Sequence, residues 1–557
     1  MLNNSLPIKE AVKHARQCQQ HGQYAEAESI CQQILAQAPH SFEALVVYCT
    51  CLIHKGAMPQ AIEYYKHFIQ KQPHHTGALT NLGNLWQQQN NRIEAEKCFR
   101  SALAIEPNFT GALNNLAGLL IKHGNAKEAL KLYCRALKTA PSDPKLNSNY
   151  LFTLQYLPKQ DPQELYKCHL QWQKNVCPHI QPMDHSKHNK TLHRPLRVGY
   201  ISPDFRTHPV AYFFGGILSN HNREQVIPYC YANVHTPDGL TEQLKKFAYQ
   251  WHNIVGMGSE AIAQCIYKDN IDILVDLAGH TANNNLEALA YKPAPIQVTY
   301  LGYPNTTGLS TIDYRFTDTI ADSPGMDDNY YVEKNIHLPH GMLNYRPAAN
   351  SPAPTIPPAV KNGFITFGCF NNLTKVSEET LETWFAILHR LPTARMIIKY
   401  RSFKDTETCH YFLTLFKKAG IAKERIEFHP NTPCYIDHLA MYNEMDIMLD
   451  TYPYNGVTTT CESLWMATPV ITRYGKTHAS HMGASILHRV DLDDFVTYTP
   501  EEAANIAARY SNNIPALKHL CDNLRQRMKA SSLLKSQQMA TDVETAYRTF
   551  WKKYVNT

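Results

Sequence analysis

Small residues and prolines recur at a fixed interval through the first quarter of the chain. Alanines, prolines and turn-forming residues each repeat every 34 residues in one shared register. This period is typical of paired helices, because glycine or asparagine turns the chain between them, alanine lets them approach closely, and proline ends the second. The pattern predicts four helix pairs over residues 8–145, stacked as a solenoid. The columns are Ala27, Ala61, Ala95 and Ala129; Pro39, Pro73, Pro107 and Pro141; and Gly22, Gly56, Asn90 and Gly124.

The 34-residue period, with its small and proline positions, resembles tetratricopeptide repeats. Such a stack presents a concave surface to an extended peptide or a partner protein. We therefore expect partner proteins to bind along the repeats, which also allow a homo-oligomer. Asn81, Asn114 and Asn115 fall on the first helices of their pairs, where side-chain amides can hold a peptide backbone. Ordinary solvated positions explain these asparagines equally well.

Residues 146–195 continue helically and then lose their periodicity. The later part reads PHIQPMDHSKHNKTLHRP, a proline-, histidine- and lysine-rich composition that is typical of a linker. Its histidines are spaced 6, 3 and 5 residues apart, which fits no common metal site. We expect a solvated loop instead. The histidines are His179, His185, His188 and His193.

From residue 196 onward, short β-branched runs alternate with helical stretches. Buried strands are predicted at LRVGYIS, VIPYCYA, IDILVDLAG, IQVTYLG and YRFTD, and again at FITFGCF, ARMIIKY, RIEFHP, MDIMLD and TPVIT. This alternation indicates two Rossmann-like parallel sheets, over residues 196–345 and 362–557, joined by a proline-rich link at 346–361. Ligands of such folds bind at the carboxyl ends of the strands, here in the cleft between domains. The last helix, around TDVETAYRTFWKKY, is expected to pack across the pair.

Composition narrows the classes of function. The chain has 557 residues, 44% hydrophobic and 18% charged, enough to bury several cores. The net charge of +6 comes without a long basic block, which argues against a nucleic-acid partner. The 15 cysteines are scattered without a CxxC, no apolar run suits a membrane helix, and the first residues lack a signal-peptide pattern. We expect a soluble cytoplasmic protein without membrane partners.

The strongest candidate site is the segment MDIMLDTYPYNGVTTTCESLWMATPVIT. A strand leads through a turn to Thr458, Thr459 and Thr460, which open a helix that carries Glu462. Unpaired amides and the helix dipole favour an anion at such a helix start, and a diphosphate is the expected guest. Glu462 can accept hydrogen bonds from ribose hydroxyls. An ordinary threonine cap with an ordinary helical glutamate is the competing interpretation.

Further polar residues follow other predicted strands. Asn372 and Lys375 follow FITFGCF, and a lysine there can neutralise a phosphate oxygen. The remaining candidates at strand ends are His208, His280, Thr281 and His438, together with Pro304, Asn305 and Thr306 of the Pro304–Gly308 loop.

Several enzyme classes lack their usual residues in this sequence. There is no GxSxG elbow, P-loop, HExxH pair or GxGxxG after a first strand, and no convincing metal cluster, so we expect neither a metal nor another cofactor.

With these motifs in order, the chain resembles the O-GlcNAc transferase and SPINDLY family of protein glycosyltransferases. The resemblance rests on LRVGYISPDFRTHPV, ILVDLAGHTANN, KPAPIQVTYLGYPNTTGL, GFITFGCFNNLTK and PYNGVTTTCESLW after the repeats. It implies a GT-B pair of Rossmann-like domains and metal-independent, inverting transfer of a sugar to serine or threonine.

The resemblance also implies roles for individual residues. His208 would lie beside the sugar and acceptor, and Lys375 on the donor diphosphate. The resemblance leaves two candidates for the group that takes the hydroxyl proton: His208 and a phosphate oxygen of the donor. The remaining implied contacts are Asn372 and His438 with the nucleotide, Thr458 and Thr459 with the phosphates, Glu462 with the ribose, and Thr281 and the Pro304–Gly308 loop with the sugar.

Two features bear on the donor. Val457 stands where O-GlcNAc transferases typically have histidine, so a side-chain contact expected of that branch is missing. The motifs GHTANN, GYPNTTGL, FNNLTK and TTTCESL are closer to SPINDLY, whose implied donor is GDP-fucose. The sequence therefore favours GDP-fucose, with UDP-GlcNAc as the alternative. A catalytically silent scaffold and a glycan-extending transferase are the other classes considered.

Overall fold

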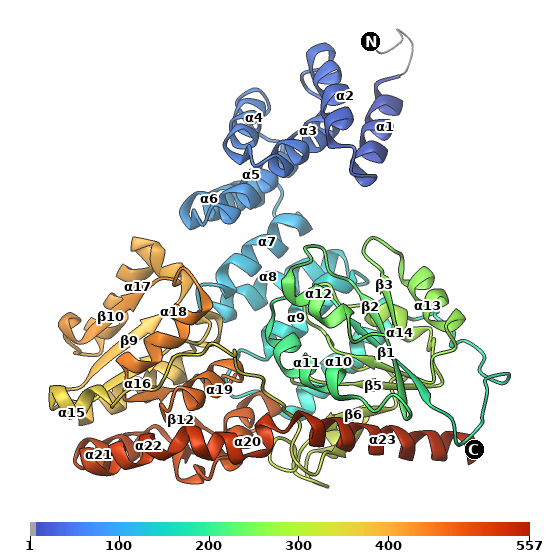
Figure 1. The fold of residues 1–557 in the computed structure, drawn as a ribbon. Helices are drawn as coiled ribbons and strands as arrows, with labels where there is room; N and C mark the ends of the chain where they lie inside the picture. Colours follow the sequence, from blue (N-terminus) through green and yellow to red (C-terminus); the bar gives the residue numbers. More distant parts are fainter. Residues whose placement is uncertain (1–6, 557) are drawn as a thin grey trace. The chain divides into compact units, whose positions relative to one another are not determined.

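The structure is a computed structural model that describes residues 7–556, and it divides into two compact units after Ala140. The first unit consists of four helix pairs (Figure 1). Its buried core contains the alanines of the 34-residue columns, such as Ala27 and Ala61. The solenoid prediction is confirmed. The helices are α1 Ile8–Gln20, α2 Tyr24–Gln37, α3 Phe42–His54, α4 Met58–Lys71, α5 Thr76–Gln88, α6 Arg92–Ile105, α7 Thr110–Ile121 and α8 Ala126–Thr139.

The second unit begins with two helices, α9 (Pro144–Leu154) and α10 (Pro162–Val176), that pack on the first sheet domain. His169 of α10 places its Nε2 2.8 Å from the hydroxyl of Tyr303. The segment after α10 is the predicted loop, without a helix or strand and with His179 and His193 exposed, but its other two histidines are bonded: His185 Nε2 lies 2.8 Å from the carbonyl oxygen of Lys292, and His188 Nε2 lies 2.7 Å from Asp272 Oδ1. These imidazoles hold the segment against the domain, which a composition count does not reveal.

The first sheet has seven parallel strands in the order β3-β2-β1-β4-β5-β6-β7. Its strands are β1 Leu196–Ser202, β2 Val226–Ala232, β3 Gln250–Asn253, β4 Ile273–Asp276, β5 Ile296–Thr299, β6 Tyr314–Thr317 and β7 Lys334–His337. The α-helices between them are α11 Pro209–Asn220, α12 Gly239–Lys245, α13 Ser259–Lys268 and α14 Leu286–Ala290.

The second sheet has six parallel strands in the order β10-β9-β8-β11-β12-β13. Its strands are β8 Thr366–Cys369, β9 Arg395–Lys399, β10 Ile426–His429, β11 Ile447–Leu449, β12 Val470–Arg473 and β13 Val496–Thr497. Its α-helices are α15 Pro358–Asn362, α16 Glu378–Arg390, α17 Thr406–Lys418, α18 Tyr435–Ala440, α19 Thr458–Trp465, α20 Met482–His488, α21 Pro500–Ser511 and α22 Ile514–Ala530. Two parallel Rossmann-like domains after a helical solenoid are the predicted fold class.

The carboxyl-terminal helix α23 (Ser536–Asn556) returns to the first domain, and Figure 1 shows it in red along that domain. Its Phe550 ring stacks on Tyr314 of β6 at 3.9 Å, and its Glu544 accepts from His221 at 2.8 Å. The range 362–557 predicted for the second domain therefore includes a helix that packs on the first. Across residues 7–556, no helix combines the length and the apolar character that crossing a membrane requires.

Candidate active site

A cavity of about 660 Å³ lies between the two sheet domains of the second unit. Its walls come from loops after strands of both sheets and from α9. Seven of the predicted site residues line the cavity. The fold therefore brings these residues together from distant parts of the chain. They are His208, Thr281, Pro304, Asn372, Lys375, Thr458 and Thr459.

The start of α19 forms one wall of the cavity. A buried carboxylate shapes the loop before it: Asp450 Oδ1 accepts from the backbone N–H of Gly456 at 2.7 Å and from the side-chain amide of Asn371 at 3.1 Å. Asn371 in turn accepts the hydroxyl hydrogen of Thr459 at 2.6 Å. These bonds fix the turn, so Thr458 and Thr459 and the first backbone N–H groups of the helix reach the cavity, where an anion is favoured.

Thr460 does not share this wall. Its side chain is fully buried and donates to the carbonyl oxygen of Gly456 at 3.0 Å. A helix turns about 100° per residue, so three successive threonines cannot all face one ligand. The prediction that Thr460 lines the donor site is wrong.

Lys375 lies at the end of the short 3-10 helix Leu373–Lys375. Its Nζ donates to the carbonyl oxygen of Asn455 at 2.8 Å and lies 4.1 Å from the centre of the Tyr454 ring. Burial lowers the pKa of Lys375 to about 8, although Asp450 opposes the shift. An ammonium that is shielded from water and lines a cavity is suited to an anionic ligand. The negative charge of the ligand compensates for the solvation that the ammonium loses on burial.

His208 is the N-cap of α11 and faces the same cavity. Its Nδ1 accepts weakly from the backbone N–H of Val210 at 3.4 Å and lies 3.5 Å from Asp204 Oδ1. Burial, with Arg206 nearby, lowers the pKa of His208 to about 4, and burial raises that of Asp204 to about 6. The imidazole is therefore neutral near pH 7.

Glu462 and His438 form a cluster beside the cavity instead of lining it. Glu462 accepts from the hydroxyls of Tyr435 at 2.8 Å and Tyr442 at 3.0 Å, and its Oε2 lies 3.0 Å from His438 Nε2. Lys399 contacts the other ring nitrogen of His438, and burial lowers the pKa of Lys399 to about 8. The structure joins the two predicted residues and adds a lysine and two tyrosines that the sequence did not single out.

Three other predicted residues are buried in internal hydrogen bonds and do not line the cavity. His280 lies 3.1 Å from the Ser148 hydroxyl and 2.8 Å from the Thr307 carbonyl oxygen. Thr306 donates to Glu333 at 2.6 Å, and Asn305 donates to Gln155 at 3.3 Å. Their predicted donor contacts are corrected to structural roles. Helices α9 and α10 cover this rim of the cavity. The sequence motifs around His280 and Asn305 do not indicate this contact.

The sequence interpretation missed several residues of the cavity wall. Asn371 is adjacent to the predicted Asn372, Asp204 lies four residues before the predicted His208, and Tyr454 occurs within the quoted PYNG motif. His478 is the least expected, because the loop after β12 that carries it belongs to none of the predicted site motifs. Its position after the predicted buried strand TPVIT is the sequence feature that could have identified His478 as a candidate.

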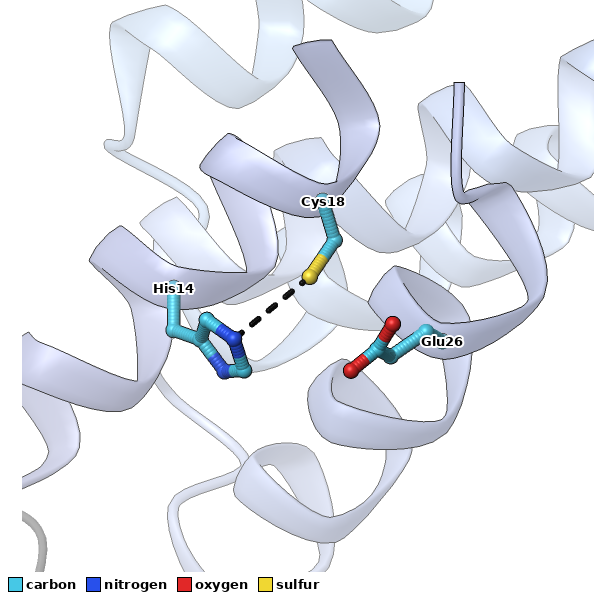
Figure 2. Close-up of side chains that lie close together, drawn as sticks. All are labelled: His14, Cys18 and Glu26. Atoms are coloured by element: carbon cyan, nitrogen blue, oxygen red, sulfur yellow. Dashed lines mark hydrogen bonds between the residues drawn. The ribbon is translucent and has the colours of Figure 1, made fainter. Parts of the chain in front are cut away.

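Within residues 7–556, two groups of three side chains have the composition of metal ligands, and neither lies in the cavity. His14 and Cys18 of α1 approach Glu26 of α2, as Figure 2 shows. Their Sγ and Nε2 atoms are 3.7 Å apart, the length of an ordinary S–H···N contact, and His14 and Glu26 are exposed. The second group is His252, Cys265 and Asp269, in which Asp269 also accepts from a tyrosine hydroxyl. Both arrangements are explained by hydrogen bonding.

Comparisons with known families agree with this architecture. The model of glycosyl transferase family 41 matches residues 166–344 and 359–543, and a tetratricopeptide-repeat model matches residues 19–67 and 88–148. A solved structure of a Thermobaculum terrenum O-GlcNAc transferase mutant is similar over 99% of this chain and 98% of its own, with a TM-score of 0.83 and 30% identity.

Curated relatives give the same grouping. A Hordeum vulgare protein named "Probable UDP-N-acetylglucosamine--peptide N-acetylglucosaminyltransferase SPINDLY" is 38% identical over 419 residues, which is 74% of this chain and 44% of that protein. An Arabidopsis thaliana relative whose name ends in SEC is 30% identical over 367 residues, 64% of this chain and 37% of that protein. The chain spans about half the length of the curated SPINDLY relatives that it matches.

Proposed function

This chain belongs to glycosyl transferase family 41, and on that premise we propose that it is a protein O-glycosyltransferase that uses a nucleotide-sugar donor. The observation that supports this most is the convergence of Lys375 and the start of α19 on one cavity between two sheet domains. A lysine and a helix start are the features that bind a diphosphate in folds of this kind.

The proposed reaction is attack by a serine or threonine hydroxyl of an acceptor protein on the anomeric carbon, with inversion, while the nucleoside diphosphate leaves. Lys375 and the N–H groups at Thr458 and Thr459 would stabilise the charge that develops on the leaving group. These groups supply the positive potential themselves, so the proposed reaction uses no metal ion.

Glu462 and His438 are proposed to hold the nucleoside. Glu462 lies one helical turn beyond Thr458 and Thr459, which line the cavity. Its carboxylate already has three partners, two of them the hydroxyls of Tyr435 and Tyr442. Ribose hydroxyls would replace or share one of these hydrogen bonds, which carboxylate oxygens can do because each accepts more than one donor.

For the donor we propose GDP-fucose. The chain is 38% identical to the SPINDLY relative and 30% identical to the SEC relative, and Val457 offers only methyl groups to the cavity where an imidazole would mark the other branch. UDP-GlcNAc is the second candidate, because the names of these relatives and the Thermobaculum terrenum protein refer to N-acetylglucosamine transfer.

Thermal unfolding with GDP, UDP, GDP-fucose and UDP-GlcNAc tests the proposed donor site. A ligand present at about 100 times its dissociation constant stabilises a protein by about 2.7 kcal/mol, which raises the midpoint measurably. We expect the guanine ligands to raise it more than the uracil ligands. A larger shift with UDP and UDP-GlcNAc would reverse the assignment of the donor, and no shift with any of the four would count against a nucleotide-sugar site.

A further inference from the structure

An aromatic cluster lies beside Lys375 in the cavity. Phe152 of α9, Tyr156 just after that helix and Tyr454 of the second domain all line the cavity. The rings of Tyr156 and Tyr454 are stacked with their centres 5.3 Å apart, and the centre of the Phe152 ring lies 6.2 Å from that of Tyr454, edge to face. The helical stretch before the first sheet therefore supplies part of the wall next to the proposed diphosphate contact.

The loop of Tyr454 holds the ammonium of Lys375 at two points. Nζ donates to the carbonyl oxygen of Asn455 at 2.8 Å, and it lies 4.1 Å from the centre of the Tyr454 ring. At that distance the negative face of an aromatic ring attracts a cation. Within residues 7–556, Asn455 is the one hydrogen-bond partner of Nζ, and no carboxylate is in ion-pair contact with it. An ammonium has three donors, so two N–H groups remain for a ligand in the cavity.

Hydrogen bonds and ring stacking fix the loop that holds Lys375. The carbonyl oxygen of Tyr454 accepts the hydroxyl hydrogen of Thr451 at 2.7 Å. The N–H of Asn455 donates to the carbonyl oxygen of Ala479 at 2.9 Å, and its side-chain amide donates to that of Thr451 at 2.8 Å. The stacked ring of Tyr156 then limits the movement of the Tyr454 side chain. The cluster therefore restricts a lysine that would otherwise have many rotamers.

Packing alone is the competing explanation of this cluster. Stacked rings close a cavity wall and contribute apolar contacts whatever charge is nearby. Packing does not account for an ammonium that lacks a carboxylate partner, because a charge shielded from water needs favourable electrostatics from its surroundings. The face of the Tyr454 ring and the carbonyl oxygen of Asn455 are the contacts that supply them.

We propose that Tyr454 is a positioning residue for Lys375 and that Tyr156 supports its ring; this rests on the proposed function, in which Lys375 contacts the leaving diphosphate. The ring keeps the ammonium charged and in place before the donor binds. Charges that are already in place stabilise a leaving group most, because they need no rearrangement during the reaction. The helical extension that carries Phe152 and Tyr156, outside both sheet domains, is then part of the catalytic unit.

The groups that face Lys375 set the direction of its titration. Burial lowers the pKa of Lys375 to about 8, while Asp450 and Cys369 oppose the shift. Burial raises the pKa of Cys369 to about 12 and also raises the pKa of Tyr454 and of Tyr156, so these three groups are neutral near pH 8. A neutral ring favours the ammonium over the free amine. Replacing the ring with an aliphatic side chain should therefore lower the pKa of Lys375 further.

The first measurement uses the full chain and needs no substrate. Acetic anhydride reacts with the free amine only, so the rate at which Lys375 is acetylated at each pH, followed by peptide mass spectrometry, reports its pKa. We expect a midpoint near pH 8 in the wild type and one about 1 pH unit lower in Tyr454→Leu. Tyr454→Phe keeps the ring and should keep the wild-type midpoint. Tyr156→Leu should shift the midpoint in the same direction by less.

The second measurement is kcat at pH 7 and saturating donor with a Ser/Thr protein acceptor. Tyr454→Leu should lower kcat by about 10-fold, and Tyr454→Phe should restore most of it. Tyr554→Leu is the matched control, because Lys190 Nζ lies 5.0 Å from the centre of that ring, on α23 and outside the cavity wall. It should keep the wild-type kcat and the wild-type midpoint of Lys375. Tyr454→Met is the second variant if Tyr454→Leu does not fold.

The outcomes separate this inference from the proposed function. Either an unchanged midpoint of Lys375 or wild-type kcat in Tyr454→Leu would overturn the positioning role while leaving the transferase intact. Equal losses in Tyr454→Phe and Tyr454→Leu would overturn the role of the ring face and assign the effect to the hydroxyl. Absence of transfer by the wild type with every donor would overturn the proposed function, and the positioning role with it, even where the midpoint shifts as expected.

Discussion

At the scale of single residues, the polar side chains that line the cavity differ from their buried neighbours in whether another part of the chain already holds them. Lys375, His208, Thr458 and Thr459 follow strands and reach the cavity, as the rule of carboxyl-terminal strand ends requires. His280 obeys the same rule but bonds to Ser148 of α9, 132 residues earlier in the chain. Such long-range partners have no local signature, and they decide which polar side chains remain free for a ligand.

Replacing Lys375 by alanine should lower turnover by about 10²–10³-fold, because the leaving diphosphate loses a charge-assisted contact. Steady-state kinetics at saturating donor would measure this, with exposed Lys361→Ala as the control at wild-type turnover. Near wild-type turnover in Lys375→Ala would contradict the assigned role.

The lowered pKa of Lys375 predicts a pH dependence of nucleotide binding. The ammonium is charged below its pKa of about 8 and loses its charge as the pH rises through that value. The dissociation constant of GDP should therefore rise between about pH 7 and about pH 9 in the wild type. Isothermal titration with Lys375→Met should give a weaker affinity without this rise, and parallel curves for the two proteins would argue against Lys375 as the titrating group.

At the scale of elements, the patterns predicted the interior strands and the edge strand β10, and missed the other three edge strands. β1 and β2 have the predicted bounds, whereas β3, β7 and β13 were not predicted. All three are edge strands, and β3 reads QWHN with no fully buried residue. An edge strand with a solvated face needs no apolar run, because its neighbour in the sheet supplies the pairing. The last helix was expected to pack across the pair of domains, and α23 does contact the first domain, at Tyr314 and His221.

A glycine pair tests the close packing behind one rim of the cavity. Gly302 follows β5, and a Cβ there would lie 2.0 Å from the carbonyl oxygen of Leu277. Gly302→Ala should therefore cost about 1–3 kcal/mol of stability and disturb the adjoining cavity wall. Gly239→Ala is the control, since a Cβ there meets nothing within 4 Å. Equal unfolding midpoints in thermal denaturation would contradict the close packing.

At the scale of the whole molecule, the two units have separate cores, which indicates that they have separate roles. The repeats have their own buried cluster, and the sheets, with α23, have another. The cavity residues all belong to the second unit. The sequence predicted this organisation because a 34-residue period and a strand–helix alternation are both strong patterns, each repeated several times.

Removing residues 1–140 should leave nucleotide binding unchanged, because every cavity residue follows that point. Modification of folded protein acceptors should fall to background if the repeats select them, as their extended surface favours. Paired measurements of the GDP dissociation constant and of acceptor labelling would test both parts. Labelling of the same proteins at the wild-type rate by the truncated chain would assign acceptor selection to the second unit.

The most direct test of the proposed transferase is the mass that it adds to proteins. The full chain is incubated with GDP-fucose or with UDP-GlcNAc and a cell lysate, and Ser- and Thr-containing peptides are analysed by mass spectrometry, with Lys375→Ala in parallel. We predict a deoxyhexose increment from GDP-fucose that is lost in Lys375→Ala. An N-acetylhexosamine increment alone would overturn the donor, and no increment from either donor would contradict the proposed transfer itself.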